Sequence, residues 1–561
     1  MSETENEFVK PRVGVFLCHC GTNIGGVVDI PAVREYVEGL PYVITAIENK
    51  YTCSDVGLTA IKQAISENGL TRVVVAACTP RTHEPLFRRT CAEAGINPFL
   101  FQFVNIREQC SWVHRDAPEA ATDKAKDLVT MGIARALLLE PLEETSVPVG
   151  DTALVIGGGV AGMAAAESFA ARKFKVVLIE KTDALGGMVK HAHKLYPSGE
   201  MPGTLLDAQL PRIEHNPHIT VKTNTELTGL KGFIGNYKAE LTTNGTEKME
   251  LDTSILVIAT GAEPLKPEGL YNYDGEHVMT QWDLEQRFNE DNLNPPKTAV
   301  MIQCVGARIP ERPYCSKICC VTALKNAMEL VEKYGTRVWI LHRDMQAWGV
   351  DYEQWYARAR DLGIRFVKYR VERPPKIEDG TILVWDEFSK MYERIPAELV
   401  VLSTPLVAHE DSEALSQLLK VPRDAHGFFL EAHVKLRPVD FATDGIFLAG
   451  ASRWPCDIPE AISTGLAAAS RASIPLQRGE VPVEPITSSV DEDKCIGCGL
   501  CEETCPYGAI SLVDLGSRRV AKVVSASCKG CGACGAGCPA HAITMRHYTD
   551  DQILAEIKAL T

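Results

Sequence analysis

Two runs of cysteine near the end of the chain restrict its folding more than any other feature. CIGCGLCEETCP begins at Cys495, and CKGCGACGAGCP repeats the same spacing from Cys528. Both have the form C-x2-C-x2-C-x3-C-P. Closely repeated thiols in a reducing compartment are typical metal ligands, and the chain must fold around the metal that they bind. The glycines between them let backbone N–H groups point at the sulfurs, and each proline ends a ligand turn.

The spacing indicates iron–sulfur clusters. In the two-cluster bacterial ferredoxin pattern, each [4Fe–4S] cluster takes the first three cysteines of one run and the fourth of the other. The sequence therefore assigns one cluster to Cys495, Cys498, Cys501 and Cys538, and the other to Cys528, Cys531, Cys534 and Cys505. Structural zinc is the alternative, but zinc sites use two separated pairs of ligands. The preceding stretch IPLQRGEVPVEPITSSVDEDK contains three prolines and no helical period, so we expect a linker there.

Length and charge limit the protein class. A chain of 561 residues has room for three or four domains of ordinary size. Its 58 basic and 73 acidic side chains give a net charge of −15, which argues against nucleic acid or an anionic membrane as the main partner. No apolar run is long enough for a membrane span, and the start MSETENEFVK is unlike a signal peptide. We expect a cytoplasmic protein whose 19 cysteines are mostly metal ligands.

Residues 152–180 carry a dinucleotide-binding pattern. A short apolar strand leads into Gly157-x-Gly159-x-x-Gly162, a helix with small residues follows, and a second strand ends at Glu180. The glycines let the backbone approach a pyrophosphate at the helix N-terminus, and the acid can accept a hydrogen bond from a ribose hydroxyl. An ordinary tight strand-to-helix turn is the alternative. The common register of strands, helix and acid favours the dinucleotide.

Three further segments resemble flavoproteins of the two-dinucleotide-binding-domain superfamily: LGGM at 185–188, ILVIATGA at 255–262 and GIFLAGA at 445–451. The resemblance implies FAD and a thioredoxin-reductase-like α/β core. It implies a discontinuous FAD domain, 147–296 with 397–478, around a second nucleotide-type domain at 297–396. Beside the glycine loop and Glu180, the implied FAD-binding residues are Lys181, Gly187, Met188, Ala259, Thr260, Gly261, Gly450, Ala451, Ile458 and Pro459.

CVGARIPERPYCSKICC, residues 304–320, stands where the second domain of that superfamily has its own glycine loop for a pyridine nucleotide. The strand TAVMIQ and a helix from about Val321 are predicted, but 297–345 contains no G-x-G-x-x-G, and RVWILHRD supplies no ribose acid directly after its strand. We therefore expect a [4Fe–4S] cluster on Cys304, Cys315, Cys319 and Cys320 in place of a nicotinamide. A redox disulfide and buried unreactive thiols are the alternatives.

The pattern C-x10-C-x3-C-C-x-x-A-L-K after a flavin domain resembles the A-subunit family of heterodisulfide reductases. CHCG, TCS, ACTPRTHEPLF and NIREQCSWVH in residues 18–114 and RDMQAWGVDYEQWYARARDLGIRF at 343–366 extend the likeness over nearly the whole chain. It implies an FAD and iron–sulfur oxidoreductase subunit that bifurcates or confurcates electrons. It also implies the B and C subunits as partners, an electron-donating dehydrogenase or hydrogenase module, and a homodimer within the complex.

In that family, Lys325 would lie near the flavin N5 as the catalytic cation, where it could stabilise the anionic reduced flavin. The alternative is a solvated helix lysine. Longer members of the family carry a second ferredoxin module inserted in the flavin domain, but residues 217–261 pass through that region with no cysteine. Cys456, in WPCDIPEAI, is left unassigned.

Residues 1–146 are predicted to form a separate α/β domain, in which the strands RVGVFLC, VITAIE and RVVVAAC alternate with helices. Several cysteines stand at strand ends, which gather at one edge of such a sheet. The resemblance implies a cluster here, and we expect the ligands Cys20, Cys53, Cys78 and Cys110, with Cys18 as the substitute. The ferredoxin domain and a C-terminal helix would complete the chain at 479–561, for a total of four clusters.

Two other functions remain open at this point. One is an NAD(P)H-oxidising FAD and iron–sulfur oxidoreductase resembling the glutamate synthase small subunit. The other is a non-catalytic iron–sulfur scaffold.

Overall fold

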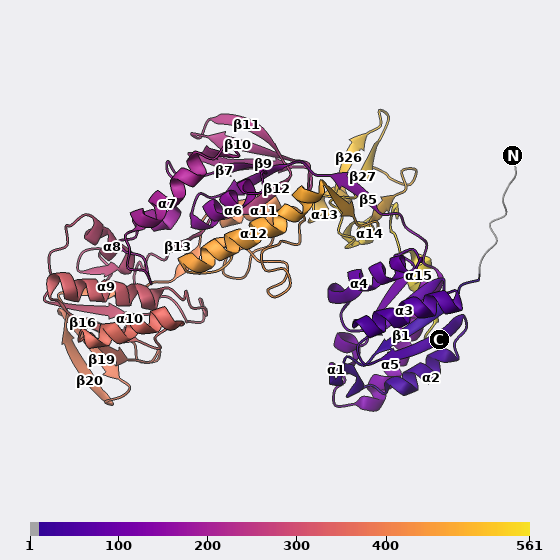
Figure 1. The fold of residues 1–561 in the computed structure, drawn as a ribbon, viewed down its shortest axis with the longest axis horizontal. Helices are drawn as coiled ribbons and strands as arrows, with labels where there is room; N and C mark the ends of the chain where they lie inside the picture. The colour runs from indigo at the N-terminus through magenta and orange to yellow at the C-terminus, as the bar shows by residue number, and fades with distance from the viewer. Residues whose placement is uncertain (1–9) are drawn as a thin grey trace. The chain divides into compact units, whose positions relative to one another are not determined.

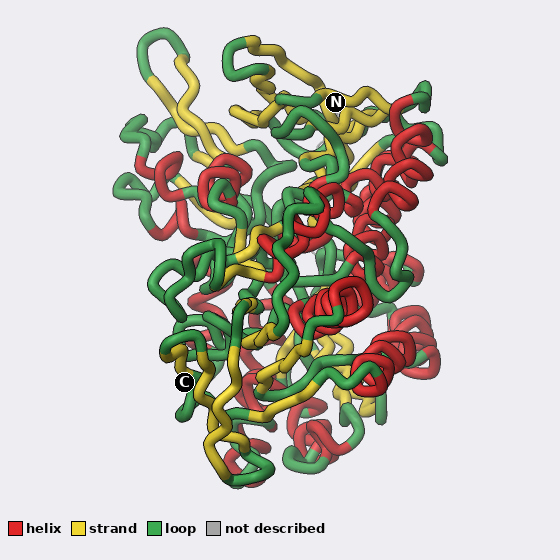
Figure 2. The backbone as a smooth tube through the Cα atoms, turned by 90° about the vertical axis from the view of Figure 1, so that its left-hand side faces the viewer, coloured by secondary structure: helices red, strands yellow, loops and turns green. Residues whose placement is uncertain are grey.

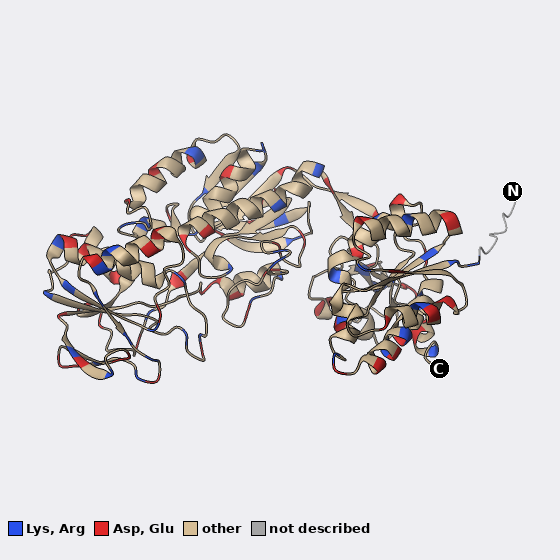
Figure 3. Cartoon of the chain, turned by 60° about the horizontal axis from the view of Figure 1, so that its bottom comes forward, with Lys and Arg blue, Asp and Glu red and all other residues tan. Residues whose placement is uncertain are grey.

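A computed structural model describes residues 10–561 and divides the chain into two compact units. Unit 1 combines the part up to Thr145 with Pro482–Thr561, and unit 2 is Ser146–Val481. Figure 1 gives the elements of both, and Figure 2 shows how helices and strands alternate with loops throughout. Acidic and basic residues are mixed along the helices of each unit (Figure 3). Within the described residues no helix is both long and apolar enough to cross a membrane.

The N-terminal part of unit 1 is a parallel four-stranded sheet in the order β2-β1-β3-β4. Its strands are β1 (Val13–Cys18), β2 (Val43–Asn49), β3 (Arg72–Ala77) and β4 (Phe101–Asn105). Successive strand residues point to opposite faces, so Val13, Val15 and Leu17 pack on one side and Phe16 and Cys18 on the other. Helices α2 (Ile30–Glu38) and α5 (Pro118–Leu137) cover the first face, and α3 (Asp55–Asn68) and α4 (Pro80–Glu93) the second.

The C-terminal part of unit 1 consists of two small antiparallel sheets and short helices. β25 (Ser488–Val490) pairs with β28 (Ile543–Met545), and β26 (Ile510–Asp514) with β27 (Arg519–Val523). The helices are α13 (Leu500–Thr504), α14 (Ala533–Ala536) and α15 (Asp550–Lys558). α15 packs on α5 of the N-terminal part.

Arg135 of α5 fastens these two parts together. Its guanidinium donates from Nε (3.2 Å) and Nη2 (2.7 Å) to the carbonyl oxygen of His547, and it stacks on the Tyr548 ring at 3.8 Å. The arginine is buried, so the interaction is shielded from solvent. The contact joins segments separated by more than 400 positions in the sequence.

Unit 2 begins with a parallel sheet in the order β23-β12-β6-β7-β8. Its strands are β6 (Thr152–Ile156), β7 (Lys175–Ile179), β8 (Ile219–Lys222), β12 (Ile255–Ile258) and β23 (Ile446–Leu448). Helices α6 (Val160–Ala170), α7 (Pro202–Glu214) and α12 (Ile458–Arg478) pack on one face. The antiparallel strands β9 (Thr225–Lys231), β10 (Tyr237–Thr243) and β11 (Glu247–Thr253) pack on the other. β23 thus pairs with β12, although residues 297–396 lie between these two strands in the sequence.

The second sheet of unit 2 is also parallel, in the order β14-β21-β15-β16-β17. Its strands are β14 (Val278–Thr280), β15 (Thr298–Ile302), β16 (Arg337–His342), β17 (Arg365–Lys368) and β21 (Leu399–Leu402). One face carries α8 (Gln281–Asn289), α9 (Cys319–Tyr334) and α10 (Val350–Asp361). The other carries β18 (Lys376–Glu378), β19 (Thr381–Asp386) and β20 (Met391–Pro396). β13 (Ala262–Pro264) pairs with β22 (Leu406–Ala408) between the two sheets.

The linker expected from Ile474 onward is wrong in its first part. α12 continues to Arg478 with Pro475 inside it, and β24 (Glu480–Val483) follows. The buried side chains Ala472 and Leu476 belong to the core under the first sheet of unit 2. Their burial extends the helix past a proline that would otherwise end it.

We predict that Arg135→Ala loosens α15. The change removes two hydrogen bonds to a buried carbonyl and a cation–π contact, which together contribute about 2 kcal/mol to holding this helix closed. Amide hydrogen exchange in residues 550–558 should therefore be roughly 30-fold faster, measured by mass spectrometry on the full chain. Arg518→Ala is the control, since its exposed pair with Asp493 at 3.4 Å contributes at most about 0.5 kcal/mol. Equal exchange rates in both variants would contradict the prediction.

Candidate functional site

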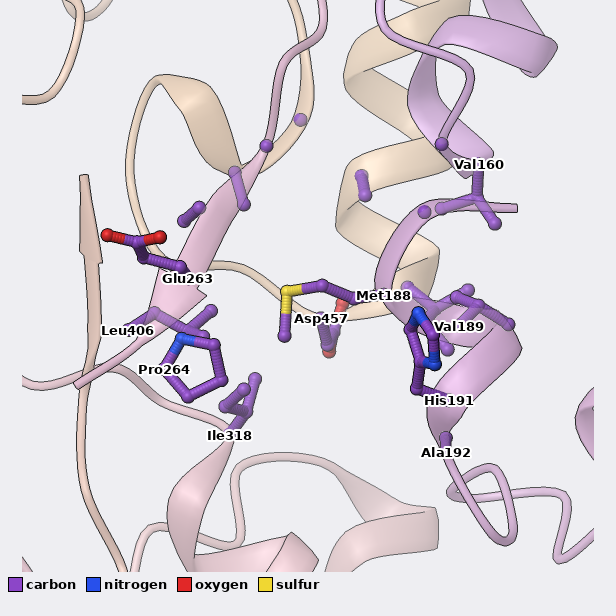
Figure 4. A pocket seen from close by; sticks show the side chains of 18 of the residues that line it. Val160, Met188, Val189, His191, Ala192, Glu263, Pro264, Ile318, Leu406 and Asp457 are labelled. Atoms are coloured by element: carbon purple, nitrogen blue, oxygen red, sulfur yellow. The ribbon is translucent and has the colours of Figure 1, made fainter. Parts of the chain in front are cut away.

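A cavity of about 490 Å³ lies in unit 2 and is open to solvent on one side. Its wall includes the loop before α6, the 3-10 turn Gly187–His191, the end of β12, the start of α9 and the start of α12. Figure 4 shows Met188 and His191 of the 3-10 turn on one side of it, and Glu263 of β13 and Ile318 before α9 on the other. A volume of several hundred Å³ is typical of sites for cofactor-sized molecules.

The glycine loop lets β6, β12 and α6 approach one another closely at this wall. Gly157 has φ +107°, and a Cβ there would lie 2.4 Å from the Ala259 carbonyl oxygen. A Cβ on Gly162 would lie 1.9 Å from the Gly157 carbonyl oxygen. α6 begins after Gly159 with no side-chain cap, so the N–H groups of its first turn are available to an anion in the cavity.

Glu180 is held rigidly at the end of β7. Its carboxylate accepts hydrogen bonds from the Gly158 N–H (2.8 Å) and from the N–H and hydroxyl of Thr182 (2.8 and 2.9 Å). A carboxylate oxygen has two lone pairs, so the fixed group can still accept from a ribose hydroxyl. Thr260, also in the wall, has a buried hydroxyl with no hydrogen-bond partner among the described residues. The residues present therefore fit a flavin dinucleotide.

Most of the predicted FAD-binding residues line this cavity. They are Gly157, Gly159, Glu180, Gly187, Met188, Ala259, Thr260, Gly261, Gly450, Ala451 and Ile458. Gly162, Lys181 and Pro459 are not in the wall. Gly162 instead lets the start of α6 pack closely on the loop that follows β6. Lys181 pairs with Asp411 and Glu226 at the surface.

Several wall residues were missed by sequence reasoning: Lys194, Tyr196, Trp282, Glu285, Thr404 and His409. They come from segments without a recognisable motif. Only the fold brings them to the cavity, so no local signal could have identified them.

Lys325 also lines the cavity and is buried rather than solvated, with 4% of its side chain exposed. Its Nζ lies 2.7 Å from Glu285 Oε1 and donates to the Lys194 carbonyl oxygen at 2.7 Å. Burial lowers the pKa of Lys325, and the charge of Glu285 opposes this shift. The ammonium is thus held in one place by a buried carboxylate and a carbonyl.

The mid-chain cysteines meet in the loop between β15 and the N-terminus of α9. Cys319 and Cys320 form the first turn of α9, which begins two residues earlier than expected. The charges of Cys320, Cys304 and Cys315 all act on Cys319, whose pKa burial raises well above its usual value. Burial also raises the pKa of Cys320 to about 12. The raised pKa values keep the thiols of Cys319 and Cys320 protonated without a metal, whereas coordination would deprotonate them.

The donors of this loop differ from those of a nucleotide-phosphate site. Asp344, the first acid after β16, pairs with Arg308 at 2.8 Å and Lys368 at 3.2 Å. Burial raises the pKa of the Cys304 thiol, and the charges of Arg343 and Arg308 and a hydrogen bond from Arg308 oppose this shift. Gln303, directly before Cys304, is fully buried, and neither amide atom has a partner among the described residues. The loop thus offers thiols, a cation and an unpaired amide, a donor set that fits an iron–sulfur cluster.

The two C-terminal runs gather in two places. Cys495, Cys498, Cys501 and Cys538 line one small cavity, and Cys505, Cys528, Cys531 and Cys534 line another. Backbone N–H groups of Ala521, Ala542 and Ala509 donate to the sulfurs of Cys495, Cys538 and Cys505 at 3.3–3.4 Å. Each cavity therefore combines three cysteines of one run with the fourth of the other.

At the N-terminal sheet, Cys18, Cys20, Cys53 and Cys78 lie at or just beyond the carboxyl ends of β1, β2 and β3; we call them the N-terminal thiol site. The charges of Cys18, Cys20 and Cys53 act on Cys78, whose pKa burial raises to about 11. The Cys20 and Thr52 N–H groups donate to Cys18 Sγ at 3.3 and 3.4 Å. The Thr52 hydroxyl is fully buried, with no partner among the described residues. These orphaned and sulfur-directed donors fit a cluster.

Cys110, which the sequence predicts as a ligand, does not join the N-terminal thiol site in the structure. Its Sγ donates to the Ala121 carbonyl oxygen of α5 at 3.0 Å, and the residue packs in the core beneath α5. The π-helical turn Arg107–Ser111 directs it there. Cys18, held as the substitute, is the cysteine that joins the other three.

Across residues 10–561, no group of three or more His, Cys, Asp or Glu side chains is spaced to hold a single metal ion. This spacing is compatible with cubanes. Four irons stand between the ligand sulfurs of a [4Fe–4S] cluster, which therefore lie farther apart than ligands of one ion.

Comparisons with known proteins match several parts of the chain. A family model described as pyridine nucleotide-disulphide oxidoreductase matches residues 151–404, and one described as a 4Fe-4S dicluster domain matches 488–545. The thioredoxin reductase of Lactococcus lactis aligns with 58% of this chain and 99% of its own, at 20% identity and a TM-score of 0.43.

Full-length relatives are closer in sequence. The A subunit of the H(2):CoB-CoM heterodisulfide,ferredoxin reductase of Methanothermobacter thermautotrophicus is 39% identical over 99% of this chain and 98% of its own. The iron-sulfur A subunit of the CoB–CoM heterodisulfide reductase of Methanocaldococcus jannaschii is 35% identical over 98% of both chains. The first alignment spans 651 positions, more than the 561 residues here, so that relative contains residues that this chain lacks.

These relatives, the two family models and the fold of each unit confirm the predicted fold class. They also confirm FAD and [4Fe–4S] clusters as the cofactors. The scaffold hypothesis is not supported, because the relatives are reductase components. The chain belongs to the A-subunit family of heterodisulfide reductases and is a flavin- and iron–sulfur-dependent oxidoreductase.

Proposed function

We propose that this chain is the electron-transfer component of a heterodisulfide reductase-like complex and its site of flavin-based electron bifurcation or confurcation. One observation carries the proposal: Cys319 belongs both to the four-thiol loop and to the wall of the flavin cavity. A bound FAD exchanges one or two electrons and each cubane exchanges one, so a flavin beside a cluster can divide or combine electron pairs.

We assign four clusters to four sets of cysteines. The ferredoxin-type sets are Cys495, Cys498, Cys501 and Cys538, and Cys528, Cys531, Cys534 and Cys505. The mid-chain set is Cys304, Cys315, Cys319 and Cys320, and the N-terminal set is Cys18, Cys20, Cys53 and Cys78. Their grouping in the structure supports each assignment. The proposed domains are 1–146, 147–296 with 397–478, 297–396 and 479–561.

Lys325 is assigned to stabilise the reduced flavin. Its ammonium stands in the wall of the cavity, and Glu285 and the Lys194 carbonyl hold it there. A fixed cation favours whichever state of a neighbouring group carries more negative charge. Its burial strengthens that effect, because solvent does not screen the charge.

Substrate reduction falls to partner proteins in this proposal. The relatives are named as A subunits of reductases that act on the CoB–CoM heterodisulfide, and by analogy this chain would act with B and C subunits, an electron-donating module and a second copy of itself. An NAD(P)H-oxidising enzyme is the second candidate, favoured only by the match to the pyridine nucleotide family. The engagement of Asp344 by Arg308 and Lys368 weighs against it.

The first test is iron content and response to reductants. Anaerobically purified full-length protein should contain about sixteen irons and one flavin per chain. Dithionite should reduce the clusters, seen by electron paramagnetic resonance. NADH or NADPH should leave the flavin absorbance unchanged without partner proteins, because thiols occupy the loop that would hold the pyridine nucleotide. Rapid bleaching by either nucleotide would instead support the second candidate.

Cys319→Ser tests the mid-chain cluster. The variant should lose about four irons while keeping its flavin, because the thiol is a cluster ligand and only one of many cavity-wall residues. Cys456→Ser is the matched control: Cys456 lines the same cavity and its thiol is outside the proposed sets, so iron should stay at the wild-type value. Equal iron in both variants would remove the mid-chain cluster from the proposal.

Lys325→Met tests the cation beside the flavin. Loss of the ammonium should lower the two-electron flavin potential by about 30 mV or more, the equivalent of about 1.4 kcal/mol, and Lys325→Arg should largely restore it. Spectroelectrochemical titration of the flavin absorbance measures the shift. Lys333→Met removes an exposed cation from the same helix and should leave the potential unchanged. A wild-type potential in Lys325→Met would contradict the assignment.

A further inference from the structure

The N-terminal thiol site has a cation beside it that sequence analysis did not identify. Arg107 stands in the π-helical turn that follows β4, and its Nη1 donates to Cys20 Sγ at 3.5 Å. Its charge also acts on Cys78, lowering the pKa of that thiol against the larger effect of burial. One guanidinium therefore reaches two of the four cysteines.

Three contacts fix this arginine. Nε and Nη2 donate to Glu108 Oε1 at 3.2 and 2.7 Å, on the atoms that do not face Cys20. The guanidinium carbon lies 4.7 Å from the centre of the Trp112 ring. The Arg107 backbone N–H donates to Asn105 Oδ1 at 3.1 Å, which anchors the turn itself. With 20% of its side chain exposed, the arginine is largely removed from solvent.

This arrangement suits a group that tunes a cluster rather than one that binds iron. The charged guanidinium offers no lone pair to iron, but hydrogen bonds to ligand sulfurs and nearby charge set the reduction potential of a cluster. Reduction adds one electron to the cluster and breaks no bond, so the site becomes more negative. A cation next to a ligand sulfur stabilises that state, and Glu108 offsets part of the effect.

We propose that Arg107 sets the reduction potential of the N-terminal cluster, raising it so that the cluster accepts electrons. The inference rests on the proposed cluster of the N-terminal thiol site. It goes beyond that proposal by naming a residue that sets the potential of that cluster.

Redox titration of the full-length protein, followed by electron paramagnetic resonance, tests the inference. The signal of the N-terminal cluster is the one lost in Cys53→Ser. In Arg107→Gln, the ratio of oxidised to reduced N-terminal cluster at a given applied potential should rise about tenfold. This corresponds to a reduction potential about 59 mV lower for a one-electron couple. Arg107→Lys, which keeps the charge without the planar fork, should fall between wild type and Arg107→Gln.

Arg12→Gln is the charge-matched control. Arg12 precedes β1 at the amino end of the same parallel sheet, away from the thiols, where it donates to the Asn68 carbonyl oxygen. It should leave the potential unchanged. Glu108→Gln provides a second test of opposite sign: it keeps Arg107 but removes the carboxylate, so the potential should rise.

The outcomes separate the two proposals. Two results would overturn the role of Arg107 and leave the cluster in place. One is an equal cluster potential in Arg107→Gln and Arg12→Gln. The other is a cluster potential that falls in Glu108→Gln. If Arg107→Gln fails to fold, the direction of the shift in Glu108→Gln decides. An iron content that Cys53→Ser leaves unchanged would overturn the N-terminal cluster, and the inference about Arg107 with it.

Discussion

Four thiols occupy the turn between β15 and α9, where a second nucleotide domain would have a glycine loop. This replacement of a glycine loop by thiols governs the chemistry open to unit 2. In a second nucleotide domain, such a strand-to-helix turn would present backbone N–H groups to a pyrophosphate. Here Cys319 and Cys320 form the first turn of α9, and Cys304 follows the end of β15. Thiolates at a helix N-terminus are favoured by the same dipole that would favour a phosphate. The fold of a nucleotide domain therefore carries thiols at the turn where such a domain would bind a phosphate.

Burial makes these thiols dependent on metal. Cys319 and Cys320 lie where desolvation raises the pKa of a thiol, so in the absence of metal they are neutral and cannot repel one another. Iron bound at this loop, as proposed, would displace their protons, so assembly of that cluster would depend on the supply of metal. Gln303 and Thr52 are buried without partners among the described residues, and an unpaired buried polar group is costly until a partner arrives.

Local spacing decided which parts could be predicted. The ferredoxin-type cysteines follow a fixed pattern, so their three-plus-one grouping was readable from the chain, and the glycine loop with Glu180 was readable for the same reason. Cys110 was not, because its side-chain direction depends on a π-helical turn that packs it against α5. Lys194 and Glu285 lie in the cavity wall through tertiary folding alone, and the helix beyond Pro475 exists because Leu476 is buried. Where packing overrode local propensity, sequence reasoning failed.

The division into units adds a constraint on electron transfer. Unit 1 holds both the N-terminal thiol site and the two ferredoxin-type sites, and Arg135 binds its two parts through the His547 carbonyl and the Tyr548 ring. Arg135 is buried, so the parts of unit 1 resist local opening more than surface ion pairs would allow. The N-terminal thiol site and the two ferredoxin-type sites thus belong to one structural unit, and the flavin cavity belongs to the other.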